Sequence, residues 1–128
     1  MDLTPLIPAG RQIVEAYGDG RFRVTGAVYE GSVLVFPGCT LPWPVAAMEQ
    51  VDVDSLAPVI AEAEAGNIEL LLLGCGARMA LVPAALRQRL RDAGVVVEAM
   101  DTGAACRTYN VLMADGRRVA AALIAFSS

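Results

Sequence analysis

The polar side chains best suited to chemistry lie near the C-terminus, where Asp101 and Thr102 precede Arg107 and Asn110. We expect Asp101 or Thr102 to cap a short helix, whose first turn offers free N–H groups and partial positive charge. Thr102, Arg107 and Asn110 would then border a site suited to a small anion or a carboxylate. On helical geometry, we expect Cys106, Arg107 and Asn110 to share one side and Ala105, Tyr109 and Leu112 to pack inward.

A second candidate segment, Gly74-Cys75-Gly76, directly follows an apolar run. Glycines let a backbone turn sharply and approach a ligand closely. Met79 occupies the third position of a dinucleotide-binding glycine pattern, so nucleotide binding is not favoured. Cys75 has two interpretations: a reactive thiol whose pKa Arg107 lowers, or an apolar filler.

The polar residues near the C-terminus also have purely structural interpretations. Arg107 could pair with Asp101 or Asp115, and Asn110 could bond to loop backbone. Under the ligand interpretation, the Gly74 loop and the helix start lie together at the carboxyl ends of neighbouring strands, where open α/β sheets bind ligands.

Trp43 lies in the segment 37–44, where three prolines argue against regular structure. One interpretation is that Trp43 closes an edge of the core. The other is that it forms a pocket wall or contacts a partner protein.

The composition excludes several kinds of chemistry. The 128 residues contain no His, and every basic residue is Arg, so Ser-His and Cys-His dyads, histidine metal ligands, Schiff-base lysines and P-loop lysines are absent. The 3 cysteines show no C-x-x-C spacing, which argues against a zinc site and fits reduced thiols. We predict no catalytic residue, metal or cofactor, and favour a non-catalytic protein while leaving catalysis open.

The net charge of −4, without a basic stripe, argues against nucleic-acid binding. No apolar run reaches the roughly 20 residues of a membrane-spanning helix, and the N-terminus lacks a basic signal-peptide region. We therefore expect a cytoplasmic protein without a transmembrane segment, and leave peripheral membrane attachment open.

The elements that would position these residues form one domain, 1–128, with an irregular N-terminal arm at 1–10. β-branched and aromatic residues between Gly-containing turns predict an antiparallel meander over 13–36. A β-α-β-α-β order then predicts right-handed, mostly parallel strand pairing. We expect helices at 55–65, capped by Asp54 or Ser55, 83–93 and 103–113, and strands at 68–73, 95–100 and 119–126.

Four segments, 17–22, 72–76, 100–110 and 116–123, resemble an uncharacterised family of Mth-like domains. The family includes the mitochondrial NADH:ubiquinone oxidoreductase (complex I) assembly factor 3 and the adipogenesis-associated Mth-like domain protein. The likeness extends from about residue 10 to residue 126. It implies a three-layer α/β fold with a mixed central sheet and an N-terminal antiparallel β segment. It also implies that most relatives lack an established enzymatic activity, and it supplies no catalytic residues.

Two functions therefore compete. The first is a non-catalytic binding or assembly-factor protein that acts through protein partners, with a link to respiratory-complex or membrane-protein assembly and with homodimerisation as a further expectation. The second is a small-molecule or anion-binding protein with a cleft at the strand ends. The candidate ligand- or partner-binding residues are Trp43, Gly74, Cys75, Gly76, Thr102, Arg107 and Asn110.

Overall fold

A computed structural model describes residues 11–127 of the chain, so the predicted N-terminal arm lies outside the described residues. The main feature is a central sheet of five strands in the order β5-β4-β8-β6-β7. Strand β6 runs parallel to both of its neighbours, β7 and β8, whereas β4 is antiparallel to both β8 and β5. The predicted α/β class with a mixed sheet is therefore confirmed. The strands are β4 (Val33–Val35), β5 (Thr40–Pro42), β6 (Leu70–Gly74), β7 (Val96–Met100) and β8 (Val119–Leu123).

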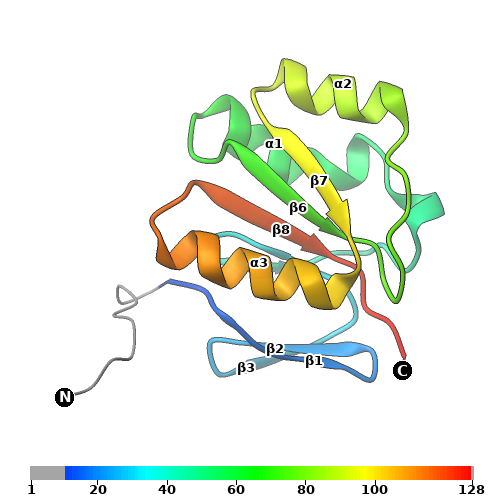
Figure 1. Ribbon diagram of the computed structural model, residues 1–128, viewed down its shortest axis with the longest axis vertical. Coiled ribbons are helices and arrows are strands. Elements are labelled where there is room, and N and C mark those ends of the chain that lie inside the picture. The colour runs from blue at the N-terminus through cyan, green and yellow to red at the C-terminus, as the bar shows by residue number, and fades with distance from the viewer. Residues whose placement is uncertain (1–10, 128) are drawn as a thin grey trace.

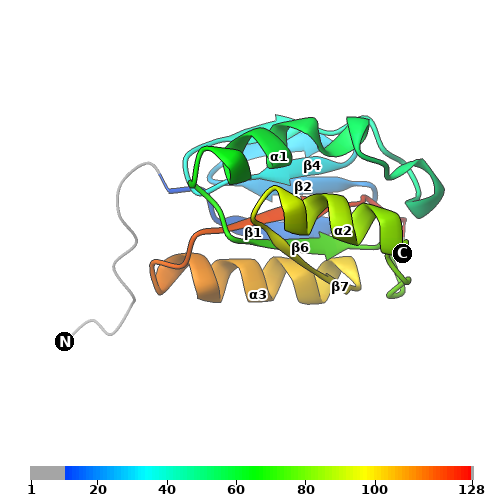
Figure 2. The same ribbon diagram turned by 90° about the horizontal axis from the view of Figure 1, so that it is seen from above.

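The helices cover both faces of this sheet (Figures 1 and 2). From β6 the chain crosses through α2 (Ala84–Asp92) to β7, and returns through α3 (Thr102–Ala114) to β8 on the other side of β6. Because both crossovers are right-handed in such sheets, the reversal of direction puts α3 on the face opposite α2. The face that α2 covers is shared by α1 (Ala57–Glu64). Among the described residues, no helix has the length and apolarity needed to cross a membrane.

Alternate residues of β8 serve the two faces, as the period of a strand requires. Ala120 and Ala122 join the core under α1 and α2, whereas Val119, Ala121 and Leu123 join the core under α3. All five residues of β8 are buried, which identifies it as the central strand of the core. The small side chains of Ala120 to Ala122 leave room for larger apolar side chains from both layers.

A second, antiparallel sheet contains β1 (Val14–Gly18), β2 (Arg21–Val24) and β3 (Ala27–Glu30). Two-residue turns join its strands, with positive φ at Asp19 and Gly20 in the first and at Thr25 and Gly26 in the second. Such turns match the twist of a hairpin. On its inner face, Phe22 and Val24 pack with residues of α3. The predicted meander is therefore divided: its first three strands form this small sheet, and β4 joins the central sheet.

The segment 37–44 differs from our expectation, because it contains the short strand β5. This strand lies at the edge of the central sheet and ends at Pro42. Proline lacks an N–H but is tolerated on edge strands, where one side of the backbone needs no partner.

Two predicted boundaries were also wrong. Neither Asp54 nor Ser55 caps α1, because both belong to a 3₁₀ turn at Asp54–Leu56 that precedes the helix. Ser55 instead exchanges hydrogen bonds of 2.8 and 3.0 Å with Asp52. The last strand ends at Leu123 rather than 126. Beyond it, the carbonyl of Phe126 accepts a 3.0 Å hydrogen bond from the Gly20 N–H, so the chain has left the central sheet for the small one.

Candidate functional site

Thr102 lies where the carboxyl ends of the parallel strands meet, and its side chain is fully buried. Its Oγ1 accepts a 2.8 Å hydrogen bond from the Gly76 N–H and donates one of 2.8 Å to the carbonyl of Ile124. The Thr102 N–H donates to the Gly76 carbonyl at 2.8 Å. Thr102 thus joins the chain that follows β6 to the chain that follows β8, and its hydroxyl already has both a donor and an acceptor.

The glycine pair serves close packing and a turn. A Cβ at Gly74 would lie 3.0 Å from the Thr102 Cα and 3.1 Å from Leu123 Cδ2, so a side chain there would force the strand ends apart. Gly76 has a φ of +96°, a conformation that favours glycine. Between them, Cys75 is half-buried against the core, with its Sγ 3.6 Å from the Leu73 carbonyl oxygen.

Asp101 caps α3 as predicted, because its Oδ1 accepts a 2.9 Å hydrogen bond from the Ala104 N–H. The next turn approaches the small sheet closely. A Cβ at Gly103 would lie only 2.6 Å from the Tyr17 hydroxyl, so glycine gives Tyr17 the space to lie over the helix. Arg107 is exposed and donates a 2.9 Å hydrogen bond to that same hydroxyl. Within the described residues Arg107 forms no ion pair, so the predicted pairing with Asp101 or Asp115 was wrong.

Asn110 binds the edge of β1 as another strand would. Its Oδ1 accepts from the Val14 N–H at 2.9 Å, and its Nδ2 donates to the Val14 carbonyl at 2.8 Å. The Asn110 side chain thereby satisfies both backbone groups of a strand residue rather than those of a loop. Sequence reasoning missed this role, since the two residues are 96 positions apart.

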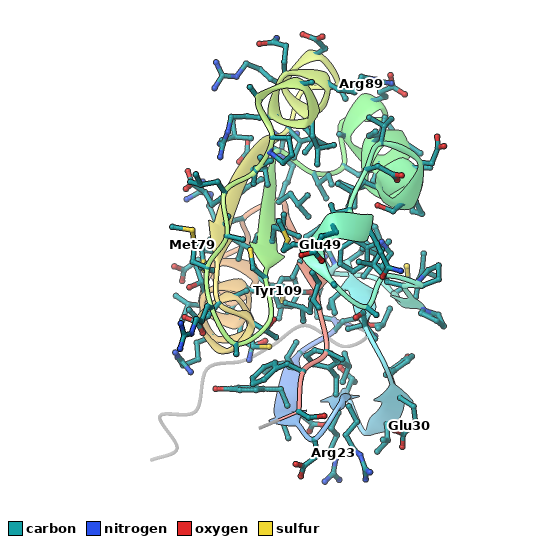
Figure 3. The ribbon with its side chains drawn as sticks, turned by 90° about the vertical axis from the view of Figure 1, so that its right-hand side faces the viewer. Arg23, Glu30, Glu49, Met79, Arg89 and Tyr109 are labelled. Atoms are coloured by element: carbon teal, nitrogen blue, oxygen red, sulfur yellow. The ribbon has the colours of Figure 1, made fainter. Side chains whose placement is uncertain are left out.

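Tyr109 supports the same contact from inside. Its ring is fully buried between α3 and the rest of the fold (Figure 3), and its hydroxyl donates a 3.0 Å hydrogen bond to the Gln12 carbonyl. Burial is the main reason that the pKa of Tyr109 is raised far above its usual value.

Cys106 lies on the inner side of α3, contrary to our expectation that it would share the outer side with Arg107. The buried face is formed by Ala105, Cys106, Tyr109 and Met113, which are spaced one, three or four residues apart. Burial raises the pKa of the Cys106 thiol to about 12, although the nearby Arg107 acts in the opposite direction. A neutral, enclosed thiol of this kind is a poor nucleophile.

Trp43 is buried on the face of the central sheet that α1 covers, opposite α3. Its Nε1–H donates a 2.7 Å hydrogen bond to the Ser55 carbonyl, so the indole fixes the start of the α1 region to the sheet. Trp43 also lines a shallow depression of about 280 Å³ with Pro44, Val45 and Ala125.

The structure therefore brings only some of the candidate residues together. Gly74, Gly76 and Thr102 converge at the strand ends, whereas Arg107 and Asn110 contact the small sheet. Larger depressions lie elsewhere: one of about 540 Å³ beside Val96 and Glu98 of β7, and one of about 470 Å³ beside Arg11, Cys39 and Asn67. The predicted ligand cleft at the strand ends stays a prediction.

Comparison with known proteins gives a family match over most of the chain. The profile of a family described as "Protein of unknown function (DUF498/DUF598)" matches residues 14–124. An uncharacterized protein of Rhodobacter capsulatus is 41% identical over 116 residues, which cover 91% of this chain and 86% of that protein. The NADH dehydrogenase [ubiquinone] 1 alpha subcomplex assembly factor 3 of Danio rerio is 34% identical over 112 residues, which cover 88% of this chain and 63% of the relative. The chain thus spans about three fifths of the length of that assembly factor.

Solved structures give the same fold. An outer membrane protein from Bartonella henselae superimposes with a TM-score of 0.85 at 34% identity, covering 92% of this chain and 98% of that one. A Bordetella pertussis protein described as a Mth938-like domain superimposes with a TM-score of 0.84 at 33% identity, covering 99% and 95% of the two chains.

Proposed function

Because this chain belongs to the family of proteins of unknown function described as DUF498/DUF598, some of whose relatives are complex I assembly factors, we propose that it is a non-catalytic assembly factor that acts by binding partner proteins. The observation that carries the proposal is the 34% identity to the assembly factor across 88% of this chain. The match covers 88% of this chain, so the likeness to the assembly factor extends over most of the domain.

The polar side chains near the C-terminus bond within the protein, which supports the proposal. Thr102, Tyr109 and Asn110 direct their hydrogen bonds to backbone groups of this chain. A catalytic group has to reach a substrate, whereas Thr102 joins two strand ends of the central sheet and Tyr109 and Asn110 hold the small sheet to α3. The sequence also has no His and no Lys, the residues that most often supply a base or an amine nucleophile near neutral pH.

In this proposal the protein is cytoplasmic and meets subunits of a membrane complex during assembly, with the respiratory NADH:ubiquinone oxidoreductase as the first complex to examine. The test is deletion of the coding sequence in the organism that encodes it, followed by separation of membrane complexes on native gels. We expect less assembled complex, unchanged transcripts of its subunits and recovery when the full chain is restored. Unchanged amounts of every respiratory complex, together with a measurable turnover by the purified chain, would overturn the proposal.

A further inference from the structure

The loop between β6 and α2 displays apolar side chains to solvent. Leu81 is 86% exposed and Met79 is 58% exposed, and Figure 3 shows Met79 at the outer margin of the protein. Single exposed apolar residues are common on protein surfaces. Two large ones within three positions of one loop are a feature that requires an explanation.

The loop is firmly attached at both ends. At its start, both backbone groups of Gly76 bond to Thr102, and at its end Val82 is buried in the core under α2. The fold therefore holds the tips of Met79 and Leu81 away from the core. Attachment at both ends limits the conformations open to the loop, which lowers the conformational entropy lost when a partner binds.

Other exposed side chains lie at the same end of the sheet. In Figure 1 the arrows of β6, β7 and β8 point toward this loop, the C-terminal tail and the β1–β2 turn. Tyr17, 40% exposed, lies against Gly103 next to Thr102, and its ring centroid is 6.5 Å from that of Phe126. We call this region the carboxyl-end surface; it contains Tyr17, Arg78, Met79, Leu81, Arg107 and Phe126. Aromatic residues, Met and Arg are the types enriched in protein interfaces.

Two arginines, Arg78 and Arg107, outnumber the exposed carboxylate of Asp19, which lies in the β1–β2 turn at this end. Within the described residues, Arg78 and Arg107 have no carboxylate within 4.0 Å, as is also true of Arg87 and Arg91 on α2, whereas Arg21, Arg23, Arg89, Arg117 and Arg118 each have one. The hydrogen bond to Tyr17 holds the Arg107 guanidinium beside an aromatic ring. Two cations without a carboxylate partner, next to apolar side chains, complement a segment that carries carboxylates beside apolar residues.

Resting on the assembly-factor function above, we propose that the carboxyl-end surface binds a protein segment with exposed apolar side chains flanked by Asp or Glu. An anionic bilayer is a poorer occupant. Each arginine near such a bilayer contributes about 1 kcal/mol, and the net charge of −4 on the chain opposes the approach. A protein segment needs only local charge complementarity.

The test uses a phage-displayed library of random peptides, panned against the immobilised full-length chain. We expect enriched peptides to combine apolar residues with Asp or Glu. Synthetic copies should bind in solution by fluorescence polarisation, and binding should weaken as salt is added. Leu81→Ser and Arg78→Glu should each weaken binding about tenfold or more, as loss of an interface anchor does. The matched control is Val111→Ser, because Val111 is 61% exposed on α3 outside the carboxyl-end surface, and it should leave binding unchanged.

Three results would overturn the inference: peptides that bind Leu81→Ser as well as the unchanged protein, enrichment without acidic residues, or Leu81-dependent binding to phosphatidylglycerol vesicles in place of peptides. This failure is distinguishable from failure of the proposed function. If deletion still lowers the assembled complex, the assembly role stands and only its surface has been misassigned. If peptides bind as expected but deletion has no effect, the surface stands and the respiratory role fails.

Discussion

Two segments leave the carboxyl end of the central sheet side by side, and they use their residues in opposite ways. Residues 102–110 of α3 hold the polar side chains that first suggested chemistry, and most of them are buried or bonded to backbone. Residues 77–82 have an unremarkable composition, yet they display Met79 and Leu81 to solvent. The segment with the specific polar pattern stabilises the fold, and the plain loop is the better candidate for binding.

The difference shows why a specific motif need not mark a reactive site. Asn110 and Tyr109 have defined geometry because they join β1 and the chain before it to α3. A small sheet that covers little area needs such directional contacts, since a small apolar core contributes limited stability. A binding loop needs only exposed side chains and ends that are attached to the fold.

The strongest way to challenge this comparison is Thr102→Val, which keeps the shape of the side chain and removes its hydroxyl. We expect the free energy of unfolding to fall by about 2–4 kcal/mol, because the Gly76 N–H and the Ile124 carbonyl each lose a buried partner. Urea denaturation measures the effect. Thr102→Ser keeps the hydroxyl and should lose less; a loss below about 1 kcal/mol in the valine variant would contradict the structural role.

Asn110→Ala tests the joint between the two sheets. Loss of both hydrogen bonds to Val14 should reduce the free energy of unfolding by about 1–3 kcal/mol. It should also speed amide hydrogen exchange in β1 more than in β6. Val111→Ala, on the exposed side of the same helix, serves as the control and should change stability by less than about 0.5 kcal/mol. Equal acceleration of exchange in both strands would show that the small sheet does not depend on this contact.

Alkaline pH should weaken the same region. The pKa values of Cys106 and Tyr109 are raised in the folded state above ordinary values of 9.0 and 10.0, so the unfolded chain loses its protons first. Their contribution is fully present below the ordinary pKa values and is lost as pH rises above them. The free energy of unfolding should therefore fall as pH rises, with a slope that approaches about 1.4 kcal/mol per pH unit for each group.

The alkaline slope can be assigned by comparing variants. Tyr109→Phe and Cys106→Ala should each reduce the slope of unfolding free energy against pH. For each variant, this free energy is expressed relative to its own value near neutral pH. An unchanged slope in the double variant would mean that other groups cause the alkaline loss.

The smallest effect on stability is expected from Arg107→Ala, because this exposed side chain makes one hydrogen bond to Tyr17 and no ion pair among the described residues. The free energy of unfolding should change by less than about 1 kcal/mol, whereas binding of acidic peptides to the carboxyl-end surface should weaken. Thermal melts and peptide titrations on one preparation measure both. A large loss of stability would instead show that Arg107 stabilises the fold, as the other polar residues of α3 do.

The sequence was informative where structure is local. The apolar runs predicted β6 and β7 to within two residues at each end, and the Asp101 cap predicted the start of α3. It was uninformative where a residue's partner lies far along the chain. Nothing near Asn110 indicates that its amide binds Val14, and nothing near Val33–Val35 indicates that this strand joins β8 instead of the preceding meander. The inward position of Cys106 depends on a wide buried face of α3, which the small sheet creates.

The pairing of β4 with β8 also determines when the protein can fold during its synthesis. Strand β4 is synthesised early, but one of its two neighbours in the sheet is β8, which consists of residues 119–123. Until those residues emerge, the nascent chain exposes the apolar side chains of β4 and has no central strand on which to place β6. We therefore expect folding after, rather than during, translation of the domain, with a need for chaperone protection in the interval. Products truncated before residue 119 lack this strand and should be removed by cellular proteases.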